Sequence, residues 1–232
     1  MNRIFVAGGT SGIGRETVEK LAESGCEVVC ACREIGRLPT HHGVRGIPFD
    51  ATNPEADVAV PEELDGFVYF PGTITLKPFA RLTDEDFLSD FEINVLGAVR
   101  VLRQALPALK RTGQASVVLF STVAVETGLP YHASIAAAKG AVEGLVRSLA
   151  AELAPSIRVN AIAPSLSDTP LASNLINSEE KKKVAGDRHP LKRIGSPSEI
   201  ADLVHFLLSD KAGFMTGQVL KVDGGLSAVR NF

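Results

Sequence analysis

The chain has 232 residues, of which 45% are hydrophobic and 22% charged, with a formal net charge of −3 and a pI near 6.0. This length suits one large α/β domain, and the composition is typical of a globular protein rather than of a disordered or fibrous one. A nucleic-acid binder needs clustered Lys and Arg, whereas the basic run at 181–183 follows two glutamates and indicates a solvated helix face. We therefore expect no nucleic-acid partner.

Cysteine usage and the first residues bear on the compartment. Cys26, Cys30 and Cys32 are odd in number and form neither a disulfide framework nor a CxxC pair, which indicates a reducing compartment. Cys30 and Cys32 alternate along a predicted strand and are expected to be small buried hydrophobes. The opening MNRIFVAGG already predicts a strand and a glycine turn, without room for a signal peptide. Since no apolar run approaches the ~18 residues of a membrane span, we expect a cytoplasmic protein without a membrane partner.

Short β-branched runs alternate with longer amphipathic runs along the chain. Candidate strands are Arg3–Ala7, Glu27–Cys32, Val44–Phe49, Gly66–Phe70, Ala115–Phe120, Ile157–Ile162 and Gln218–Val222. Candidate helices are Ile13–Ser24, Asp84–Arg111 with a break expected near Phe91, His132–Leu153, Pro197–Ser209 and a weaker one at Ser178–Gly186. Alternating strands and helices imply right-handed crossovers and a sheet covered on both faces. We predict a single α/β domain over residues 1–232, with a doubly wound parallel sheet of about seven strands.

The first chemical signal is the glycine-rich stretch AGGTSGIGRE, residues 7–16, which follows a predicted strand and opens a predicted helix. A dinucleotide-binding turn requires this context. Gly8 would permit the tight exit from the strand, Gly12 the approach of backbone to a pyrophosphate, and Gly14 the packing of helix on sheet. The helix N-terminus would offer free N–H groups to the phosphates. Taken alone, the stretch also fits a plain strand-to-helix turn.

Motifs elsewhere in the chain favour the nucleotide interpretation. The spacing Gly-x-x-x-Gly-x-Gly resembles that of the short-chain dehydrogenase/reductase (SDR) family. The resemblance covers nearly the whole chain and rests on FEINVLGAVR with Asn94, VVLFST with Ser121, the helix of Lys139, IRVNAIAPSLSDTP at 157–170 and the stretch from PLKRIG to VDGG. It implies a Rossmann-type fold, a nicotinamide cofactor and a small-molecule substrate. It also implies cofactor contacts at Gly8, Thr10, Ser11, Gly12, Ile13 and Gly14.

The end of the second strand bears on which nicotinamide cofactor binds. NAD-preferring relatives carry an acidic residue there, whereas this chain has Arg33, whose guanidinium would pair with a 2′-phosphate. We expect NADP (NADPH). NAD stays an alternative, because Ser11 stands where many NADP-preferring members carry a basic residue and Glu34 would serve a ribose in a slipped register. The resemblance also assigns adenine contacts to Asp50 and the backbone of Ala51, although Asp50 equally fits a turn.

Residues 50–72 depart twice from the family pattern. Pro54 and Pro61 leave little room for the helix that usually joins the third and fourth strands, so this edge of the sheet is expected to be thinly covered. The turn after the fourth strand reads Phe70-Pro71-Gly72, where the family usually has Asn-Ala-Gly. Gly72 still allows backbone to approach the cofactor, but the polar side chain is gone.

The family's catalytic set is Asn, Ser, Tyr and Lys. The resemblance implies that Tyr exchanges a proton with the substrate oxygen, Ser hydrogen-bonds that oxygen, Lys lowers the Tyr pKa and holds the ribose, and Asn anchors a water. Asn94, Ser121 and Lys139 match, but four residues before the lysine, on the same helical face, stands Ile135. Isoleucine carries no proton, and losing general acid–base catalysis costs ~10²–10⁴ in rate.

Two nearby residues are candidates to deliver the proton instead. Tyr131 lies one further turn back and would lie on the same helical face as Lys139 if the helix began at Pro130. However, helical side chains lean toward the N-terminus, which would point the Tyr131 ring away from Lys139. His132 offers an imidazole. Both residues also fit a loop that packs over the cofactor cleft.

The segment after the sixth strand is expected to border the nicotinamide. The resemblance places Pro164 there, with Thr169 as a carboxamide or phosphate contact, whereas Ser165 departs from the glycine that usually follows the proline. The stretch 166–188, rich in Ser, Asn and Lys, is expected to be a mobile substrate lid. A surface excursion without function is the alternative.

Three functions stay open at this point. The chain is an NADP(H)-dependent oxidoreductase with altered proton delivery, suited to an activated C=C, a quinone or a carbonyl; a nucleotide-binding or sensing protein; or a structural subunit. Retained Ser121 favours the first and Ile135 the second. Scattered histidines predict no metal site. Helices 92–111 and 132–153, the latter largely apolar around its circumference, are expected to pair in a homodimer or homotetramer.

Overall fold

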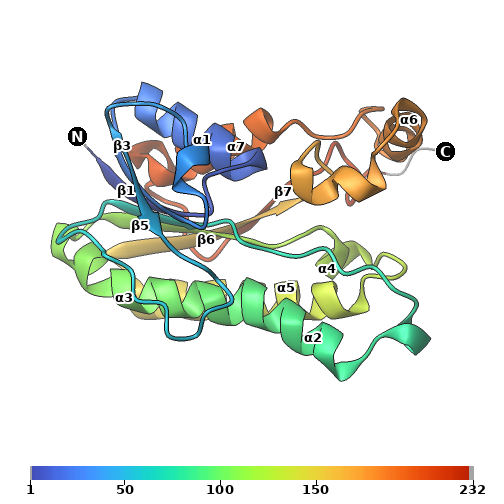
Figure 1. Ribbon diagram of the computed structural model, residues 1–232, viewed down its shortest axis with the longest axis horizontal. Helices are drawn as coiled ribbons and strands as arrows, with labels where there is room; N and C mark the ends of the chain where they lie inside the picture. The colour runs from blue at the N-terminus through green and yellow to red at the C-terminus, as the bar shows by residue number, and fades with distance from the viewer. Residues whose placement is uncertain (1, 230–232) are drawn as a thin grey trace.

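A computed structural model describes residues 2–229 and shows a parallel sheet between two helical layers (Figure 1). The sheet has seven strands in the order β3-β2-β1-β4-β5-β6-β7, and every neighbouring pair is parallel. The strands are β1 (Arg3–Ala7), β2 (Glu27–Cys32), β3 (Val44–Pro48), β4 (Gly66–Tyr69), β5 (Ala115–Phe120), β6 (Ile157–Pro164) and β7 (Val219–Val222). The predicted single doubly wound Rossmann-type domain is confirmed.

The helices cover both faces of the sheet. Helices α1 and α7 pack together on one face, while α3 and α5 lie on the other (Figure 1). The α-helices are α1 (Gly12–Glu23), α2 (Asp84–Phe91), α3 (Gly97–Thr112), α4 (Ala124–Thr127), α5 (Ala133–Leu153), α6 (Glu179–Asp187) and α7 (Pro197–Leu208). The 3-10 segments are η1 (Ile35–Arg37), η2 (Phe79–Arg81), η4 (Pro170–Leu175) and η5 (Asp210–Ala212). A π-helical turn, η3, spans Glu92–Leu96.

Strand order reverses between β1 and β4. The chain runs from β1 outward to β3 and returns to pair β4 with the other side of β1. Gly8 N donates to Ala31 O at the end of β2, and Phe70 N donates to Ala7 O, both at 2.9 Å. The turns after β1 and β4 therefore leave the same edge of the sheet, and a crevice opens there, at the topological switch point.

The structure refines several predicted boundaries. The expected break of the long central helix near Phe91 is confirmed, since α2 ends there and the π-helical turn carries the chain into α3. Residues 49, 70 and 218 fall outside the strands predicted to include them, and β6 continues two residues further than predicted. The 3-10 segment η4 and short α4 were not predicted.

The connection from β3 to β4 contains no helix among its described residues, as the two prolines predicted. A loop covers this edge instead, because Val58 N donates to Gln104 Oε1 and Gln104 Nε2 donates to Ala56 O, each at 2.9 Å. Val58 and Leu64 are buried against the core. The edge is therefore closed by loop residues pinned to α3.

Two core clusters lie one on each face of the sheet, and a third, small cluster of Ala172, Ile176 and Ala185 lies within the stretch 166–188. Cys30 and Cys32 belong to the cluster under α1 and α7, which confirms that they act as small buried hydrophobes. Burial raises the pKa of the Cys30 thiol to about 12. Within residues 2–229, no helix has the length and apolar character to cross a membrane.

Candidate active site

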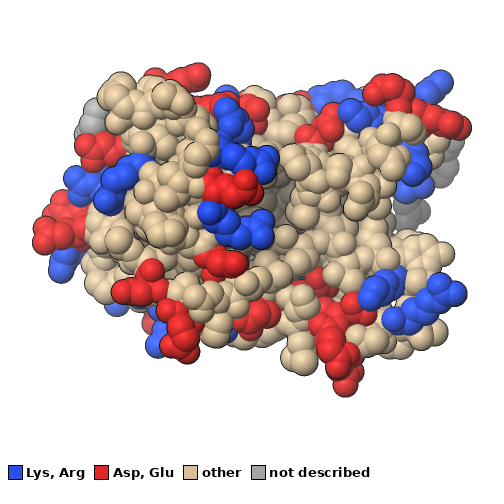
Figure 2. All heavy atoms as spheres, viewed as in Figure 1, with Lys and Arg blue, Asp and Glu red and all other residues tan. Residues whose placement is uncertain are grey.

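A cavity of about 1180 Å³ follows the carboxyl edge of the sheet. Its wall combines the turns after strands β1 to β6 with the start of α5 and the stretch 166–188. Figure 2 shows a hollow near the middle of the viewed face, with Lys and Arg side chains gathered beside it. The cavity has a nucleotide end at the glycine-rich turn and a reaction end around Lys139.

The glycine-rich turn is fixed by backbone contacts. Gly8 and Gly12 have φ of +86° and +52°, in the left-handed region that favours glycine. A Cβ on Gly14 would lie 2.0 Å from the carbonyl oxygen of Gly8, so no larger residue fits there. The N-cap residue Ser11 makes no side-chain cap, which leaves the first N–H groups of α1 to an anion. The turn therefore fits a pyrophosphate.

Beyond this turn, the wall contains the three residues expected at the adenosine, Arg33, Asp50 and Ala51. Arg33 is exposed and lines the cavity, whereas Glu34 pairs with Arg37 at 3.4 Å and is not part of the wall. Asp50 Oδ1 accepts hydrogen bonds from Thr52 N at 3.0 Å and Thr52 Oγ1 at 2.8 Å. These bonds hold the pKa of Asp50 below its usual value. Asp50 thus stabilises a turn, the alternative role predicted for it, and also lines the cavity.

Lys139 occupies the reaction end with its ammonium buried. It is 8% exposed, and Nζ donates to Phe120 O at 3.0 Å. Burial lowers the pKa of Lys139 to about 8, partly offset by the charge of Asp90. A Cβ on Gly72 would lie 3.0 Å from Asn94 Oδ1 and 3.6 Å from Lys139 Nζ. Gly72, Asn94 and Lys139 therefore enclose one small polar space.

Asn94 lies behind this space rather than in the wall itself. It is 2% exposed and comes from the π-helical turn. Its Nδ2 donates to Thr73 Oγ1 at 2.8 Å and Asp90 O at 2.7 Å, while Oδ1 has no partner among the described residues. Buried amide oxygens nearly always accept a hydrogen bond. The oxygen is thus oriented to accept one from a group beside Lys139.

The position one turn before Lys139 is apolar in the structure as in the sequence. Ile135 lies in the first turn of α5, is 4% exposed and lines the cavity. Tyr131 has φ of +70°, is 60% exposed and is absent from the wall, because α5 begins only at Ala133. His132 lines the cavity, with Nδ1 2.7 Å from Pro130 O. Of the two candidate substitutes, only His132 borders the cavity.

Ser121 also lines the cavity, but its hydroxyl proton is already donated to another side chain. Its hydroxyl donates to Glu143 Oε1 at 2.7 Å, and Glu143 lies one turn after Lys139 on α5. A hydroxyl has a single proton, so Ser121 presents lone pairs to the cavity in this geometry. Glu143 was not predicted from the sequence, although its i+4 spacing from Lys139 places both residues on the same face of α5.

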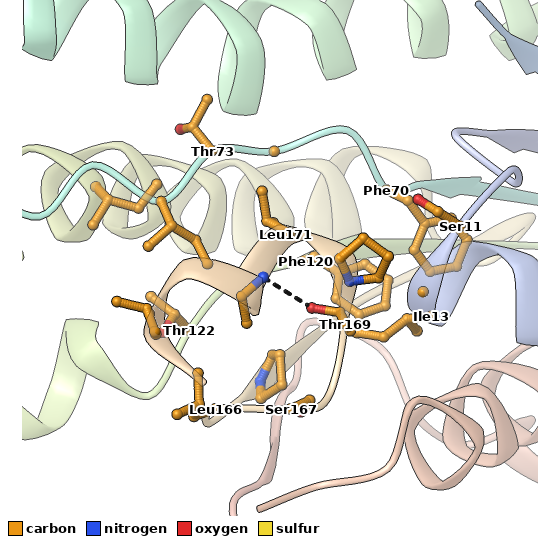
Figure 3. Close-up of a pocket in the computed structure, with 18 of the residues that line it drawn as sticks. Ser11, Ile13, Phe70, Thr73, Phe120, Thr122, Leu166, Ser167, Thr169 and Leu171 are labelled. Carbon is orange, nitrogen blue, oxygen red and sulfur yellow. Dashed lines mark hydrogen bonds between the residues drawn. The ribbon is translucent and has the colours of Figure 1, made fainter. Parts of the chain in front are cut away.

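The stretch 166–188 closes one side of the cavity. Thr169 lies against Gly12, where an added Cβ would come within 3.3 Å of its side chain. Its hydroxyl accepts from Ala172 N, the dashed bond in Figure 3, and caps η4. Leu166 and Leu171 face the same space (Figure 3). The stretch predicted as a lid therefore forms a wall in which apolar and polar side chains are mixed.

Comparison with known proteins assigns the family. The family model described as enoyl-(acyl carrier protein) reductase matches residues 7–227. A tropinone reductase homolog of Arabidopsis thaliana is 36% identical over 240 residues, with 96% of this chain and 92% of the relative covered. The chain belongs to the short-chain dehydrogenase/reductase family. A tropinone reductase homolog of Datura stramonium is 34% identical over 241 residues, covering 95% and 90%.

Solved SDR structures agree with this assignment. Aldohexose dehydrogenase from Thermoplasma acidophilum superposes with a TM-score of 0.88 at 28% identity, covering 100% of this chain and 96% of that one. A short chain dehydrogenase family protein from Francisella tularensis gives a TM-score of 0.89 at 30% identity, covering 99% and 100%. The protein is an SDR-type oxidoreductase. Its described residues contain no cluster of potential metal ligands.

Proposed function

We propose that the protein transfers hydride between NADP(H) and a small molecule, an activated C=C, a quinone or a carbonyl, without proton delivery by a tyrosine. The observation that carries the proposal is the buried Lys139 ammonium, held beside Gly72 and Asn94 while Ile135 fills the acid/base position. A buried amine is costly, and a protein that only needed the fold would gain nothing from it.

The residues of the cavity wall fit each part of the cofactor. Backbone N–H groups at Gly12, Ile13 and Gly14 would hold the pyrophosphate, with Gly8, Thr10 and Ser11 shaping the turn. Arg33 would pair with the 2′-phosphate. Asp50 and Ala51 would contact the adenine, while Lys139 would bind the nicotinamide ribose, with Pro164 and Thr169 beside the nicotinamide. When bound, NADPH supplies the hydride.

Lys139 and Ser121 determine which substrates suit the reaction end. The Lys139 ammonium stabilises negative charge that develops nearby in a site of low dielectric. Ser121 offers only its oxygen lone pairs to the substrate, because its hydroxyl proton is donated to Glu143. An activated acceptor that forms a stabilised anion therefore suits the site better than a simple ketone. The matching family model concerns an enoyl reductase, and an enoyl group is an activated C=C, which supports this choice.

The test begins with fluorescence titrations of NADPH and NADH. NADPH is expected to bind at least ~10-fold tighter, and Arg33→Ala should remove that preference without weakening NADH. NADPH oxidation is then followed with menadione, 2-cyclohexen-1-one and cyclohexanone. We expect turnover of the first two and a rate lower by ~10²–10⁴ for cyclohexanone. Nucleotide binding without turnover would favour a sensing role, and no binding would leave a structural one.

We also propose a cytoplasmic homo-oligomer. The three cysteines are free thiols, which supports a reducing compartment. The exposed residues of α5 include Ala137, Gly144 and Ala151, small side chains that let a second helix approach closely. Pairing through helices 92–111 and 132–153 would give a dimer or tetramer. A monomer in sedimentation at micromolar concentration would exclude it.

A further inference from the structure

A serine–histidine pair lines the cavity where β6 meets the segment after α6. Ser165 follows the last residue of β6, and His189 is only 3% exposed although it borders the cavity. His189 Nε2 lies 2.9 Å from Ser165 Oγ, and its Nδ1 lies 3.0 Å from Ala185 O. Both ring nitrogens are thus engaged.

The partners of the ring determine where its protons lie. A carbonyl oxygen only accepts, so Nδ1 carries a proton and donates to Ala185. In the neutral ring, Nε2 accepts the hydroxyl proton of Ser165; in the imidazolium, Nε2 donates to Ser165 Oγ and releases the hydroxyl proton toward the cavity. A hydroxyl paired with an imidazole that a third group orients is the arrangement of an activated hydroxyl.

Backbone hydrogen bonds hold the pair in place. Ser165 N donates to Val222 O in β7, and Ser167 Oγ donates to Ser165 O, both at 3.2 Å. His189 N donates to Gly186 O at 2.9 Å. The pair therefore rests on two elements of the fold rather than on a free loop.

The pair also lies close to the segment that carries Ser121. Val123 N donates to Pro164 O at 3.3 Å, so the turn after β5 runs beside the end of β6. In Figure 3, Thr122 and Leu166, the residues that follow the two serines, lie at the end of the cavity away from Ser11. Ser165 thus belongs to the reaction end.

We propose that Ser165 and His189 form the proton relay of this site, in place of the missing phenol. The inference rests on the proposed function. In reduction, hydride supplied by bound NADPH, which would be oxidised to NADP⁺, would add to the substrate carbon and leave negative charge on the substrate oxygen or enolate. The Ser165 hydroxyl proton passes to that anion, and the Nε2 proton of the His189 imidazolium replaces it. The neutral ring then regains a proton from solvent through the Ser165 hydroxyl, because its Nδ1 is bonded to Ala185 O and its Nε2 faces Ser165. Oxidation runs the same steps in reverse.

The test compares Ser165→Ala and His189→Gln with wild type. Glutamine keeps a hydrogen-bonding amide near Ser165 but cannot pass a proton on, so it separates positioning from proton transfer. His42→Gln, on the exposed loop before β3, is the matched control. We expect kcat with NADPH and 2-cyclohexen-1-one to fall ~10–100-fold in both variants, with the NADPH Kd changed by less than about twofold.

Two further readouts exclude a merely structural role. The double variant should be no slower than the single ones, because two members of one relay are not additive. The solvent isotope effect on kcat should rise in both single variants, since proton delivery then limits the rate.

The outcomes separate the relay from the proposed function. Failure of wild type to oxidise NADPH with any probe would remove the proposed function and the relay together. Turnover by wild type with unchanged kcat in both variants would overturn the relay alone. A kcat loss confined to His132→Gln would also overturn it, because the proton would then come from the start of α5.

Discussion

The two ends of the cavity are built in different ways. At the nucleotide end, we expect backbone geometry to bind the cofactor, since Gly8 and Gly12 have positive φ and Gly14 packs directly on the Gly8 carbonyl. At the reaction end, side chains from distant segments meet, among them Ser121 and Lys139. Few residue types other than glycine tolerate positive φ or such close backbone packing, so the nucleotide end keeps the family pattern. The reaction end can change one side chain at a time, and we propose that Ile135, in place of the expected tyrosine, is such a change.

Isoleucine at position 135 is compatible with the fold because its side chain has no polar group that needs a hydrogen-bond partner. It is buried against the cavity without a polar partner to satisfy. An acid/base residue at this position acts on the substrate rather than on the stability of α5. Chemistry at the reaction end is therefore separable from folding, whereas nucleotide binding at the other end is not.

The largest expected effect comes from Ile135→Tyr, which tests this separation. A hydroxyl one turn before the Lys139 ammonium would restore an acid/base, so cyclohexanone reduction should rise by ~10²–10⁴. Steady-state NADPH oxidation measures it, with Ile135→Phe as a control that adds the ring without the proton. An unchanged rate would mean that the reaction end has been rebuilt around another proton source.

Gly14→Ala should break the nucleotide end. The new Cβ would press on the Gly8 carbonyl, and relieving that contact must open the turn. We expect NADPH affinity to fall roughly 100-fold and the unfolding free energy to fall by about 1–3 kcal/mol. Gly36→Ala is the matched control, because no atom lies within 4 Å of its added Cβ. Equal NADPH affinities of the two variants by fluorescence titration would contradict the backbone account.

The buried ammonium predicts a dependence of stability on pH. The folded-state pKa of Lys139, about 8, lies below its usual 10.5. Between these values the unfolded chain binds the extra proton, so the unfolding free energy should rise with pH, by at most about 3 kcal/mol over the whole window. Below pH 8 both states are protonated and the burial penalty is fully present. Urea unfolding should show this rise in wild type and lose it in Lys139→Met; parallel profiles would refute the assignment.

A smaller effect is expected where Glu143 holds the proton of Ser121. Glu143→Leu should free the hydroxyl to donate to a substrate oxygen and raise cyclohexanone reduction up to ~10-fold. Glu143→Gln keeps an acceptor oxygen and should stay near wild type in the same assay. A fall in rate for the leucine variant would instead show that the carboxylate activates Ser121.

Most of the fold was predictable because its signals are local. Each strand follows from a β-branched run, and the break near Phe91 and the missing helix between β3 and β4 follow from nearby residues. The glycine-rich turn was likewise predictable from the spacing of its own glycines. Boundaries moved by one or two residues because pairing with neighbouring strands, rather than composition, decides where a strand ends.

The reaction end was predictable only in part. The identity of Asn94, Ser121 and Lys139 came from motifs, and the structure brings them to one end of the cavity. Hydrogen bonds between residues far apart in the sequence could not be predicted. Ser165 and His189 are 24 positions apart, and no motif in either segment indicates that the two side chains are in contact. Thr169 was expected to contact the cofactor, yet its hydroxyl also caps a 3-10 turn that no periodicity indicated.

The place of α7 has a consequence for synthesis. Residues 197–208 are synthesised long after α1 but share its face of the sheet. Ile200, Val204 and Leu207 fill the cluster beneath both helices. While the ribosome is still adding residues up to about 200, that face keeps apolar surface open to other chains. Emergence of α7 from the ribosome, rather than of the elements before it, then sets when the nascent protein can close this side of its core.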